Sequence, residues 1–384
     1  MRILQLSKFY PPVNGGIESV VFDLTEGLNS HGEITNVLCA NESRHTIREE
    51  GRYKVTRAAS MGKLLSTSIA PRLVYELARQ HSSYDILHVH LPDPMMNFAL
   101  WATRPKAKIV VHWHSDVVHQ RLALKLYAPL QQWLLQRADG IVATSARYAE
   151  SSVWLREFMS KVHVIPLGAR DVAVAPSAES VMEICRRFGH KRIVLALGRM
   201  VYYKGFEHLI RASRYLPSDV HVVIGGHGDL FDELNRLVRA EGLSDRVTLT
   251  GRIPQAELPA LYAAAEIFCL PSIVRAEAFG VVLLEAMAAS LPVVATEIEG
   301  SGVPWVNQHG VTGLNVPPAV PEALAEALNT LLSQPRGAAA LGGAGRRRFL
   351  ECFTADLMVE RTLCLYRQLS AFVEDSSHRP ATRS

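Results

Sequence analysis

The 384-residue sequence lacks the features that mark membrane, secreted and disulfide-rich chains. It has no uninterrupted apolar run of about eighteen residues, the length that a transmembrane helix needs. Its N-terminal residues reach Lys8 without the apolar region and cleavage site of a signal peptide. Its five cysteines are odd in number and far apart, so they indicate neither a disulfide framework nor a zinc site. We therefore expect a cytoplasmic protein whose cysteines are reduced and fill its cores.

An excess of charge of one sign is also missing. Lys and Arg number 41 against 37 Asp and Glu, which gives a net charge of +4, and the densest basic run covers only residues 346–348. This balance does not favour a nucleic-acid partner. With 48% hydrophobic and 20% charged residues the composition is that of a globular protein, and the length predicts two domains.

Short apolar runs alternate with helical patterns along the chain, which predicts an α/β fold with parallel sheets. The first unit is a strand over 2–6, a glycine-containing loop and a helix over 18–30. A small, polar segment over 171–180 separates two similar halves. Further strands are expected at 36–40, 86–90, 108–112, 140–144, 162–165, 192–197, 220–224, 247–250, 267–270 and 292–296. Further helices are expected at 69–79, 122–137, 181–188, 207–215, 230–240, 254–265, 280–289, 321–332 and 354–372.

Two loops that follow predicted strands have the residues of an anion site. Gly15 and Gly16 allow backbone N–H groups to approach a ligand at a helix N-terminus, although such a pair often forms only a tight turn. Arg199 and Lys204 follow the strand over 192–197, where two cations suit a diphosphate. The spacing is not that of a P-loop, so nucleotide hydrolysis is not indicated. The alternative is a solvated surface loop without a ligand. The position of these residues at the end of a strand argues against that alternative.

A third glycine-rich loop covers residues 225–229. It lacks the last glycine of the dinucleotide-binding fingerprint, which disfavours a nicotinamide-dependent dehydrogenase. A strand-to-helix turn with Asp229 as N-cap explains the loop at least as well as a ligand contact does.

Two acidic residues, Glu277 and Glu285, lie in an apolar segment. A buried carboxylate at Glu285 needs partners, and the paired hydroxyls of a ribose would provide them. If one helix carried both, the acids would lie about 12 Å apart along its axis and about 80° apart around it, near enough to line one cleft. Two exposed helix charges are the alternative, which suits Glu277 better than Glu285.

Histidines gather in the first half of the sequence. Strand alternation places His88 with His90, and His112 with His114, on common strand faces. The only acidic co-ligands nearby are Asp93 and Asp116, and the chain contains no Asp-x-Asp pair, so a metal is disfavoured. A polar cleft with residues 114–116 at its edge is the preferred interpretation.

Taken together, these motifs resemble those of the retaining nucleotide-sugar glycosyltransferases of family 4, which have the GT-B fold. The resemblance rests on Gly-Gly-Ile-Glu at 15–18, His-Ser-Asp at 114–116, Gly-Arg and Lys-Gly at 198–205, and the two glutamates eight residues apart. It implies two Rossmann-like parallel-sheet domains facing a cleft, with the C-terminal helix crossing back to the first. The expected domains are an acceptor-side domain (1–170, completed by about 355–372), a nucleotide-sugar-binding domain (185–352) and a flexible tail (373–384).

The resemblance also implies a role for each motif residue. Arg199 and Lys204 would neutralise the donor diphosphate in place of a metal, so neither a metal nor another cofactor is expected. Glu285 would bind the ribose, and Glu277 would lie beside the hydroxyls of the transferred sugar. The expected catalytic residues are His114, Arg199, Lys204 and Glu277. The remaining expected donor-site residues are Gly15 and Gly16, the main chain at Arg252 and Ile253 near the base, Phe279 and Gly280.

Residues 272–280 and 114–116 are similar to those of bacterial mannosyl- and rhamnosyltransferases that build O-antigens or exopolysaccharides on polyprenyl-diphosphate carriers. This similarity favours GDP-mannose as donor and leaves UDP-sugars open. A lipid-linked acceptor would bring the protein to the cytoplasmic face of the inner membrane, where the mixed apolar and basic segment over 117–137 could lie in the interface. Packing of that helix on its own sheet is the alternative. A nucleotide-sugar epimerase and a non-catalytic pathway scaffold are the rival functions.

Overall fold

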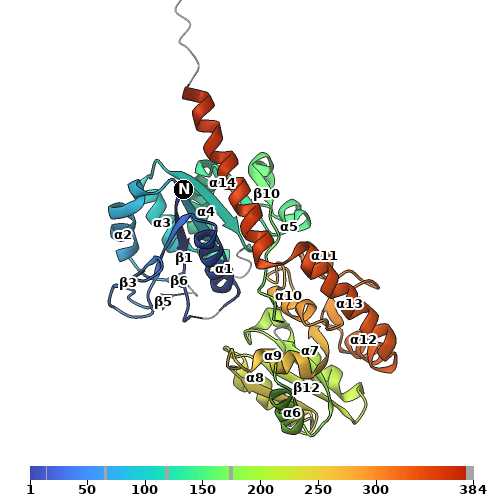
Figure 1. Ribbon diagram of the computed structural model, residues 1–384. Coiled ribbons are helices and arrows are strands. Elements are labelled where there is room, and N and C mark those ends of the chain that lie inside the picture. Colours follow the sequence, from blue (N-terminus) through green and yellow to red (C-terminus); the bar gives the residue numbers. More distant parts are fainter. Residues whose placement is uncertain (14, 65–66, 117–120, 173–175, 378–384) are drawn as a thin grey trace, which may run out of the picture. The chain divides into compact units, whose positions relative to one another are not determined.

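The computed structural model describes the chain apart from residues 14, 65–66, 117–120, 173–175 and 378–384 (Figure 1). The chain divides into two compact units, each with its own largely or wholly parallel sheet. Unit 1 comprises Met1–Leu167 together with Ala355–Ser384, and unit 2 comprises Gly168–Thr354. The predicted α/β class with two Rossmann-like domains is thereby confirmed. Among the described residues, no helix is long and apolar enough to cross a membrane.

The sheet of unit 1 has the strand order β10-β9-β8-β7-β1-β2-β4-β3. All of its strand pairs are parallel except β3–β4, which corrects the expectation of a purely parallel sheet. All four residues of β3 are exposed, so this edge strand has no apolar run to reveal it. The strands are β1 (Arg2–Ser7), β2 (Ile34–Ala40), β3 (Ile47–Glu50), β4 (Lys54–Ala58), β7 (Ile86–Leu91), β8 (Lys108–Trp113), β9 (Gly140–Ala143) and β10 (Val162–Val164). A separate hairpin consists of β5 (Lys63–Leu64) and β6 (Thr67–Ser68).

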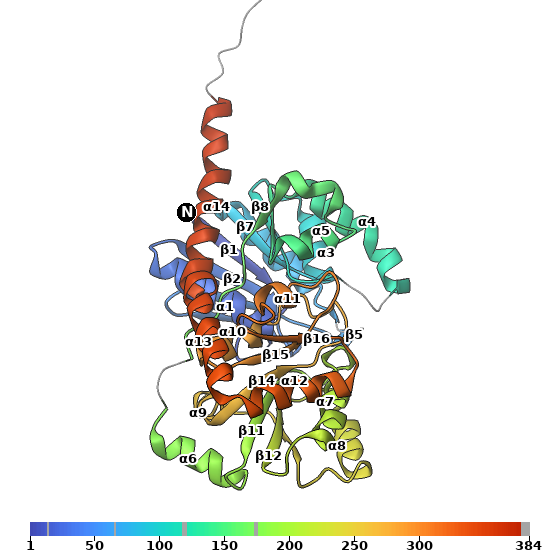
Figure 2. The ribbon, with the colours of Figure 1, turned by 90° about the vertical axis from the view of Figure 1, so that its right-hand side faces the viewer.

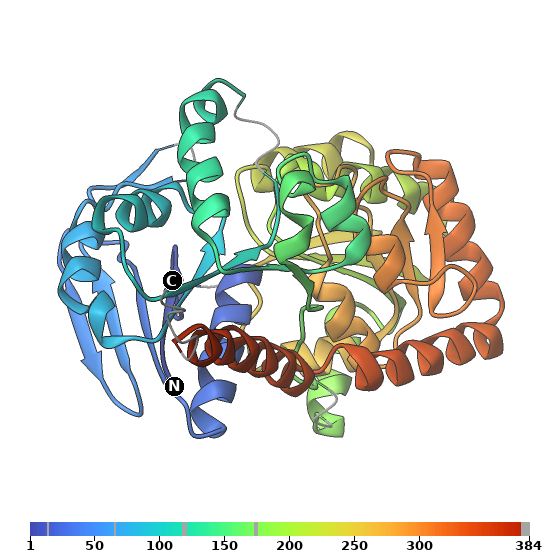
Figure 3. The same ribbon diagram turned by 90° about the horizontal axis from the view of Figure 1, so that it is seen from above.

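The C-terminal helix α14 (Ala355–Ser377) returns to unit 1, as predicted, and packs beside α1 (Gly16–Ser30) (Figure 3). Val359 of α14 fits against Gly27 of α1, where a Cβ atom would clash with it. α14 runs five residues beyond the predicted helix end at 372, so the helix includes the start of the expected tail, and residues 378–384 lie outside the described part of the chain. The other helices of unit 1 are α2 (Arg72–Gln80), α3 (Pro94–Thr103), α4 (Arg121–Arg137) and α5 (Ala146–Ser151).

Helix α4 covers most of the segment considered for membrane contact, whose residues 117–120 lie outside the described part. Toward its C-terminal end, Leu134 and Leu135 are fully buried, and the helix packs on α3. Trp133 is partly exposed and lies under the guanidinium of Arg104, 4.8 Å from its ring centre. This end of α4 therefore belongs to the packing of unit 1.

The sheet of unit 2 is wholly parallel, with the order β13-β12-β11-β14-β15-β16 (Figure 2). Its strands are β11 (Arg192–Leu197), β12 (Val220–Gly225), β13 (Val247–Gly251), β14 (Ala265–Leu270), β15 (Val293–Thr296) and β16 (Gly313–Val316). Its helices are α6 (Ala178–Arg187), α7 (Phe206–Ala212), α8 (Phe231–Ala240), α9 (Leu258–Ala264), α10 (Val281–Ala288), α11 (Val303–Val306), α12 (Pro321–Ser333) and α13 (Pro335–Cys352). The strand order places β11 beside β12 and β14, so the loops after these strands are neighbours.

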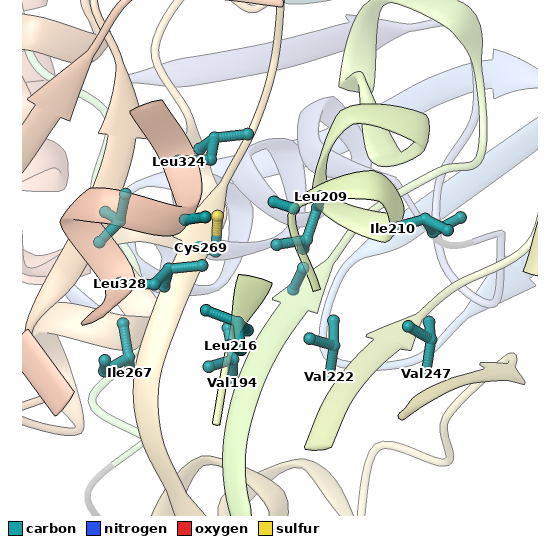
Figure 4. Packing of buried hydrophobic residues seen from close by; sticks show 14 of the residues in the cluster. Val194, Leu209, Ile210, Leu216, Val222, Val247, Ile267, Cys269, Leu324 and Leu328 are labelled. Atoms are coloured by element: carbon teal, nitrogen blue, oxygen red, sulfur yellow. The ribbon is translucent and has the colours of Figure 1, made fainter. Parts of the chain in front are cut away.

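Helices cover the sheet of unit 2 and enclose its core (Figure 4). Leu324 and Leu328 of α12 belong to one buried cluster with Ile267 and Cys269 of β14. Cys39 and Cys269 are buried, as expected of cysteines that fill cores, whereas Cys364 is exposed and does not fit that expectation. Burial in the core raises the pKa of the Cys269 thiol, which keeps it in the unreactive neutral form.

Candidate functional site

The loop after β11 is built around the side chain of Lys204. This lysine ends a short 3₁₀ turn, and its side chain packs against Gly198, the residue after β11. A Cβ atom at Gly198 would stand only 3.0 Å from Lys204 Cε. The next residue, Gly205, has a φ of +63° and lies so close to the backbone of Pro271 that a Cβ atom would clash with its carbonyl oxygen. The backbone N–H of Ile273 donates to the carbonyl of Tyr203 at 2.9 Å. The loops after β11 and β14 are therefore joined through their backbones.

Lys204 forms a buried ion pair with Glu277. Its Nζ donates a hydrogen bond of 2.6 Å to Glu277 Oε2, and each residue is only 7% exposed. The hydroxyl of Ser272 donates to the same oxygen at 2.9 Å. Burial alone lowers the pKa of Lys204, but the charge of Glu277, with a contribution from Tyr203, outweighs it and raises the pKa above its ordinary value. The lysine is therefore a fixed cation.

Arg199, in contrast, is exposed. Its charge lowers the pKa of Lys204, so the two cations that the sequence singled out interact electrostatically. Glu277 neutralises one of them, and Arg199 supplies the positive charge that remains. Such an arrangement suits a group that bears more negative charge than one lysine can match.

Glu277 lies in a turn rather than in a helix. Its N–H donates to the carbonyl of Val274 at 3.0 Å, and α10 begins only at Val281, after Gly280 at a φ of +80°. The distance and angle estimated from a continuous helix between Glu277 and Glu285 are therefore wrong. Ser301 donates to the Glu277 carbonyl, which fixes the backbone of the turn.

Glu285 of α10 already has a partner in unit 2. The hydroxyl of Tyr262, on α9, donates to Glu285 Oε2 at 2.6 Å, and Tyr262 is 1% exposed. Burial, with the neighbouring charge of Glu285, raises the pKa of this tyrosine well above its usual value, so it remains a hydrogen-bond donor. The carboxylate, which is partly exposed, is thus oriented by a residue that the sequence gave no reason to select.

Phe279 is a core residue. Its side chain is 2% exposed and lies 6.1 Å from the ring of Trp305 and 6.0 Å from that of Phe353, between ring centres. Only its backbone is left to contact a ligand. Gly280 begins α10 with the positive φ that its lack of a side chain permits.

The glycines after β12 serve close packing of the loops. A Cβ atom at Gly226 would clash with the carbonyl oxygen of Gly198, and one at Gly228 with that of Met200. The N–H of Met200 donates to the carbonyl of His227 at 3.1 Å. These contacts favour a structural role for the loop. Asp229 is not the N-cap that was expected, because α8 begins at Phe231 with Leu230 before it.

The backbone around Arg252 and Ile253 follows β13. Arg252 is exposed, while Ile253 packs so closely over Gly225 that a side chain there would clash with it. Both residues line a small pocket of unit 2, together with Ile184, Arg187, Phe188, Thr250, Pro254, Glu257 and Leu261.

In unit 1, Gly15 is the N-cap of α1 and Gly16 its first residue. The carboxylate of Glu18 folds back so closely that a Cβ atom at Gly15 would clash with it. An acidic group therefore already occupies the positive end of α1, which is where the sequence led us to expect a bound anion.

His114, directly after β8, is part of a stack of four histidines, the others being His88 and His90 of β7 and His112 of β8. His88 lies on the same side as His90, and His112 on the same side as His114, as the alternation predicted. The four rings form one stack in which neighbouring rings lie 4.2 to 5.3 Å apart between centres. All four are buried, and burial lowers the pKa of each, to about 3 for His88 and His114. The stack is therefore neutral at pH 7. His114 is only 6% exposed, so it is more enclosed than the cleft-edge position predicted for it.

Ring nitrogens of His88, His90 and His112 lie within 4.8 Å of one another, a spacing that a metal ion would accept. Their present arrangement does not converge on one point, because the rings are stacked and lone pairs lie in the ring planes. Both nitrogens of His90 are also in hydrogen bonds, to Gln5 and His114. The stack is better described as a set of neutral, stacked rings in which His88, His90 and His114 form hydrogen bonds.

Asp116, beside His114 in sequence, is held by its surroundings. Its carboxylate accepts from the indole of Trp113 at 2.9 Å and from the hydroxyl of Ser152 at 2.8 Å. Its backbone N–H donates to the hydroxyl of Tyr148 at 2.7 Å. These bonds fix the backbone that follows β8 and hence the position of His114.

Two family models match the chain. Residues 14–171 match "Glycosyltransferase Family 4", and residues 179–348 match "Glycosyl transferases group 1". Three curated relatives are each 34% identical. They are the O-antigen chain mannosyltransferase C of Escherichia coli (96% of this chain, 99% of the relative), the D-rhamnosyltransferase WbpZ of Pseudomonas aeruginosa (92% and 93%), and a GDP-mannose-dependent α-(1-6)-phosphatidylinositol monomannoside mannosyltransferase of Mycolicibacterium smegmatis (91% and 94%).

The fold is also that of known structures. The sucrose-phosphate synthase of Thermosynechococcus elongatus superposes with a TM-score of 0.81 at 24% identity, covering 97% of this chain and 100% of that one. At this identity the likeness concerns the fold alone.

Proposed function

Since the chain belongs to the family 4, group 1 glycosyltransferases, we propose that it transfers mannose from GDP-mannose, with retention of configuration, to a saccharide carried on polyprenyl diphosphate. The product would be part of a surface polysaccharide, an O-antigen or an exopolysaccharide. The proposal is supported by two relatives whose names specify mannose transfer, one of them with GDP-mannose as donor. A UDP-sugar is the alternative donor.

The observation that carries this proposal is the charge arrangement after β11. Departure of a nucleoside diphosphate develops negative charge on the leaving phosphate, and cations fixed beforehand stabilise that charge more than they stabilise the ground state. Arg199 is exposed and Lys204 is held by Glu277 at 2.6 Å. An ammonium group has three N–H donors, so a bond to Glu277 leaves others for a phosphate oxygen. We assign the diphosphate to these two side chains.

The same contacts suit a reaction on one face of the sugar. Glu277 Oε2 accepts bonds from Lys204 and Ser272, which makes the carboxylate a poor nucleophile. In the proposed step, the bond from the sugar C1 to the phosphate oxygen breaks and a bond from C1 to the acceptor oxygen forms. The acceptor's hydroxyl proton passes to the departing phosphate oxygen. Glu277 would contact hydroxyls of the sugar, and His114 would lie near C1.

The remaining donor contacts are assigned to the other expected residues. Glu285, oriented by Tyr262, would bind the ribose hydroxyls. The backbone at Arg252 and Ile253 would contact the base, and the backbone at Phe279 and Gly280 would contribute amide or carbonyl groups. Gly15 and Gly16 would approach the distal phosphate or the acceptor, which requires the Glu18 carboxylate to move.

The direct test is transfer of radiolabelled sugar from GDP-mannose, and separately from UDP-glucose and UDP-N-acetylglucosamine, to a synthetic polyprenyl-diphosphate saccharide. We expect transfer from GDP-mannose to be the fastest, with unchanged turnover in EDTA because the two cations replace a metal. Donor incubated alone should be hydrolysed slowly. Rapid isomerisation of the donor would instead indicate an epimerase, and no transfer from any donor would favour a scaffold.

A lipid-linked acceptor leads us to propose peripheral contact with the inner membrane. The support comes from α3, where Phe98 and Trp101 are each more than 40% exposed and their rings stack 5.8 Å apart. The guanidinium of Arg104 lies 5.3 Å from the ring of Trp101. Exposed aromatic rings beside basic groups suit the interface of an anionic membrane.

A further inference from the structure

We propose that Gln5 and His90 are positioning residues that hold His114 in a single tautomer, with its proton on Nε2 and a lone pair on Nδ1. His114 then offers its outer nitrogen as a hydrogen-bond acceptor. The tautomer is a property of unit 1 alone, and only its effect on turnover rests on the proposed function.

The inference starts from a continuous chain of hydrogen bonds across three strands. Gln5 of β1 lies opposite His88 of β7 in the sheet, and its Oε1 stands 2.9 Å from His90 Nε2. His90 Nδ1 stands 2.9 Å from His114 Nε2, directly after β8. Gln5 and His90 are no more than 1% exposed, so water does not compete for these bonds.

The amide oxygen at the start fixes the direction of every proton in this chain. A carbonyl oxygen only accepts, so His90 Nε2 must carry the proton that it shares with Gln5. A neutral imidazole has one N–H, which leaves His90 Nδ1 as an acceptor. His114 Nε2 must then donate to it, and His114 Nδ1 is left with a lone pair. The opposite orientation of the Gln5 amide would reverse both protons, so the two outcomes are distinct.

This argument requires both rings to be neutral, and their environment ensures that. Titratable side chains packed around them include His88, which stacks on His90, and His112, which stacks on both His90 and His114. Burial and the neighbouring histidines lower the pKa of His90, and burial lowers that of His114. The hydroxyl of Tyr366 bonds to His88 Nδ1 at 2.5 Å.

The outer nitrogen is the one that remains for a ligand. Among the described residues, His88 Nε2 and both nitrogens of His112 are fully buried and have no hydrogen-bond partner. His114 Nδ1 does not belong to this group of enclosed nitrogens. A lone pair there accepts a hydrogen bond from a hydroxyl and repels a phosphate oxygen. The chemical group at His114 is therefore a sugar or acceptor hydroxyl, whereas the diphosphate lies at the cations of unit 2.

The experiment is nitrogen NMR of the full-length chain labelled with ¹⁵N-histidine, in which protonated and unprotonated ring nitrogens have separate signals. In the wild type, we expect His114 to be protonated at Nε2 and not at Nδ1, from pH 7 down to pH 5. A proton on Nδ1, or two tautomers in comparable amounts, would overturn the proposal. This spectrum needs neither a variant nor activity.

The cause is tested with Gln5→Met, which keeps the length of the side chain and removes the acceptor. A buried His90 N–H without a partner is unfavourable, so the chain should reverse and the His114 proton should move to Nδ1. We expect kcat to fall about tenfold or more, with a smaller change in the KM for the donor. His112→Phe keeps a ring in the stack, removes no hydrogen bond of the chain, and should leave the His114 tautomer as it is.

The possible failures are distinguishable. If Gln5→Met keeps the wild-type tautomer of His114, Gln5 is not the positioning residue. If the tautomer reverses but kcat is unchanged, the hydrogen-bond chain is confirmed, and the proposal that His114 Nδ1 accepts a hydrogen bond during turnover is wrong. If Gln5→Met does not fold, the wild-type spectrum still decides the tautomer. Loss of transfer from every donor in the wild type would count against the proposed function alone.

Discussion

The ammonium group of Lys204 lies 2.6 Å from the carboxylate of Glu277, and both are more than nine-tenths buried. The two residues were selected separately from the sequence, one for a diphosphate and one for a sugar hydroxyl. Their pairing means that neither can be changed without leaving the other as a buried charge, so activity and stability must be measured together.

Replacement of Lys204 should affect both properties. Lys204→Met leaves the buried Glu277 carboxylate without a cation, which should lower the free energy of unfolding by about 3 kcal/mol or more. Transfer should fall by about two orders of magnitude or more, since a fixed charge on the leaving group is lost. Urea unfolding and a transfer assay measure the two effects.

The double variant Lys204→Met/Glu277→Gln is the matched control. It removes both charges, so much of the lost stability should return while transfer remains low. A double variant as active as the wild type would contradict the assignment of the diphosphate to Lys204.

The pair Tyr262–Glu285 should act mainly on donor binding. Glu285→Gln weakens charge-assisted bonds to ribose, and we expect the donor KM to rise about tenfold or more with a smaller change in kcat. Tyr262→Phe removes the bond that orients the carboxylate and should raise KM less. Initial rates at varied donor concentration measure both. Equal affinity of the Glu285→Gln variant for the free nucleotide would show that the ribose lies elsewhere.

The histidine stack should make the protein sensitive to acid. In the unfolded chain a histidine has a pKa of about 6.5, whereas burial lowers the pKa of His88 and His114 to about 3. Between these values the unfolded state binds more protons, so the free energy of unfolding falls as pH falls, by about 1.4 kcal/mol per pH unit for each histidine.

His112→Phe tests this directly. Burial also lowers the pKa of His112. Its replacement should therefore make the free energy of unfolding fall less steeply between pH 6 and pH 4, by about 1.4 kcal/mol per pH unit. Urea unfolding at several pH values, compared between variant and wild type, isolates this contribution from that of other groups. Parallel pH profiles would mean that His112 is protonated equally in both states.

The close approach of the loops after β11 and β12 predicts a strong difference between two glycines. Gly226→Ala should destabilise unit 2 severely, because its Cβ would clash with the Gly198 carbonyl. Gly242 has a φ of +68° and no atom near its missing Cβ, so Gly242→Ala should cost only about 1–2 kcal/mol of backbone strain. Thermal unfolding of both variants measures the difference, and similar melting temperatures would refute it.

Membrane contact through α3 predicts sedimentation with liposomes of anionic lipid. Trp101→Ser should reduce the bound fraction several-fold, because an interfacial ring is lost. Tyr215→Ser, at an exposed aromatic of unit 2, serves as the control and should bind like the wild type. Recovery of all wild-type protein in the supernatant would exclude this contact.

Much of the fold could be predicted because buried parallel strands are continuous apolar runs. β11 was predicted with its observed bounds, and the neighbouring strands within a few residues. Two of the segments that were missed have no such signal. β3 is exposed throughout, and α13 contains several glycines that sequence patterns treat as helix breakers. Gly342 is required by packing, because a Cβ atom there would clash with the Ser290 carbonyl.

The candidate site was predicted by residue type but not by geometry. Arg199, Lys204 and Glu277 were all selected, yet their sequence positions say nothing of the pairing between residues 73 apart. The start of the helix was predicted within one residue, but Gly280, with its positive φ, separates Glu277 from α10, so helix geometry does not relate the two glutamates. Gln5 and Tyr262 were missed because a single glutamine or tyrosine in an apolar element is usually a packing residue.

Because α14 completes unit 1 with the last part of the chain, the order of synthesis differs from the order of the domains. Every residue of unit 2 leaves the ribosome before Tyr366 can reach His88. Unit 2 can thus complete its folding before unit 1, which must wait for the synthesis of α14 with part of its surface uncovered. A released chain truncated after residue 354 would accordingly hold a protease-resistant second domain and a first domain that chaperones still recognise.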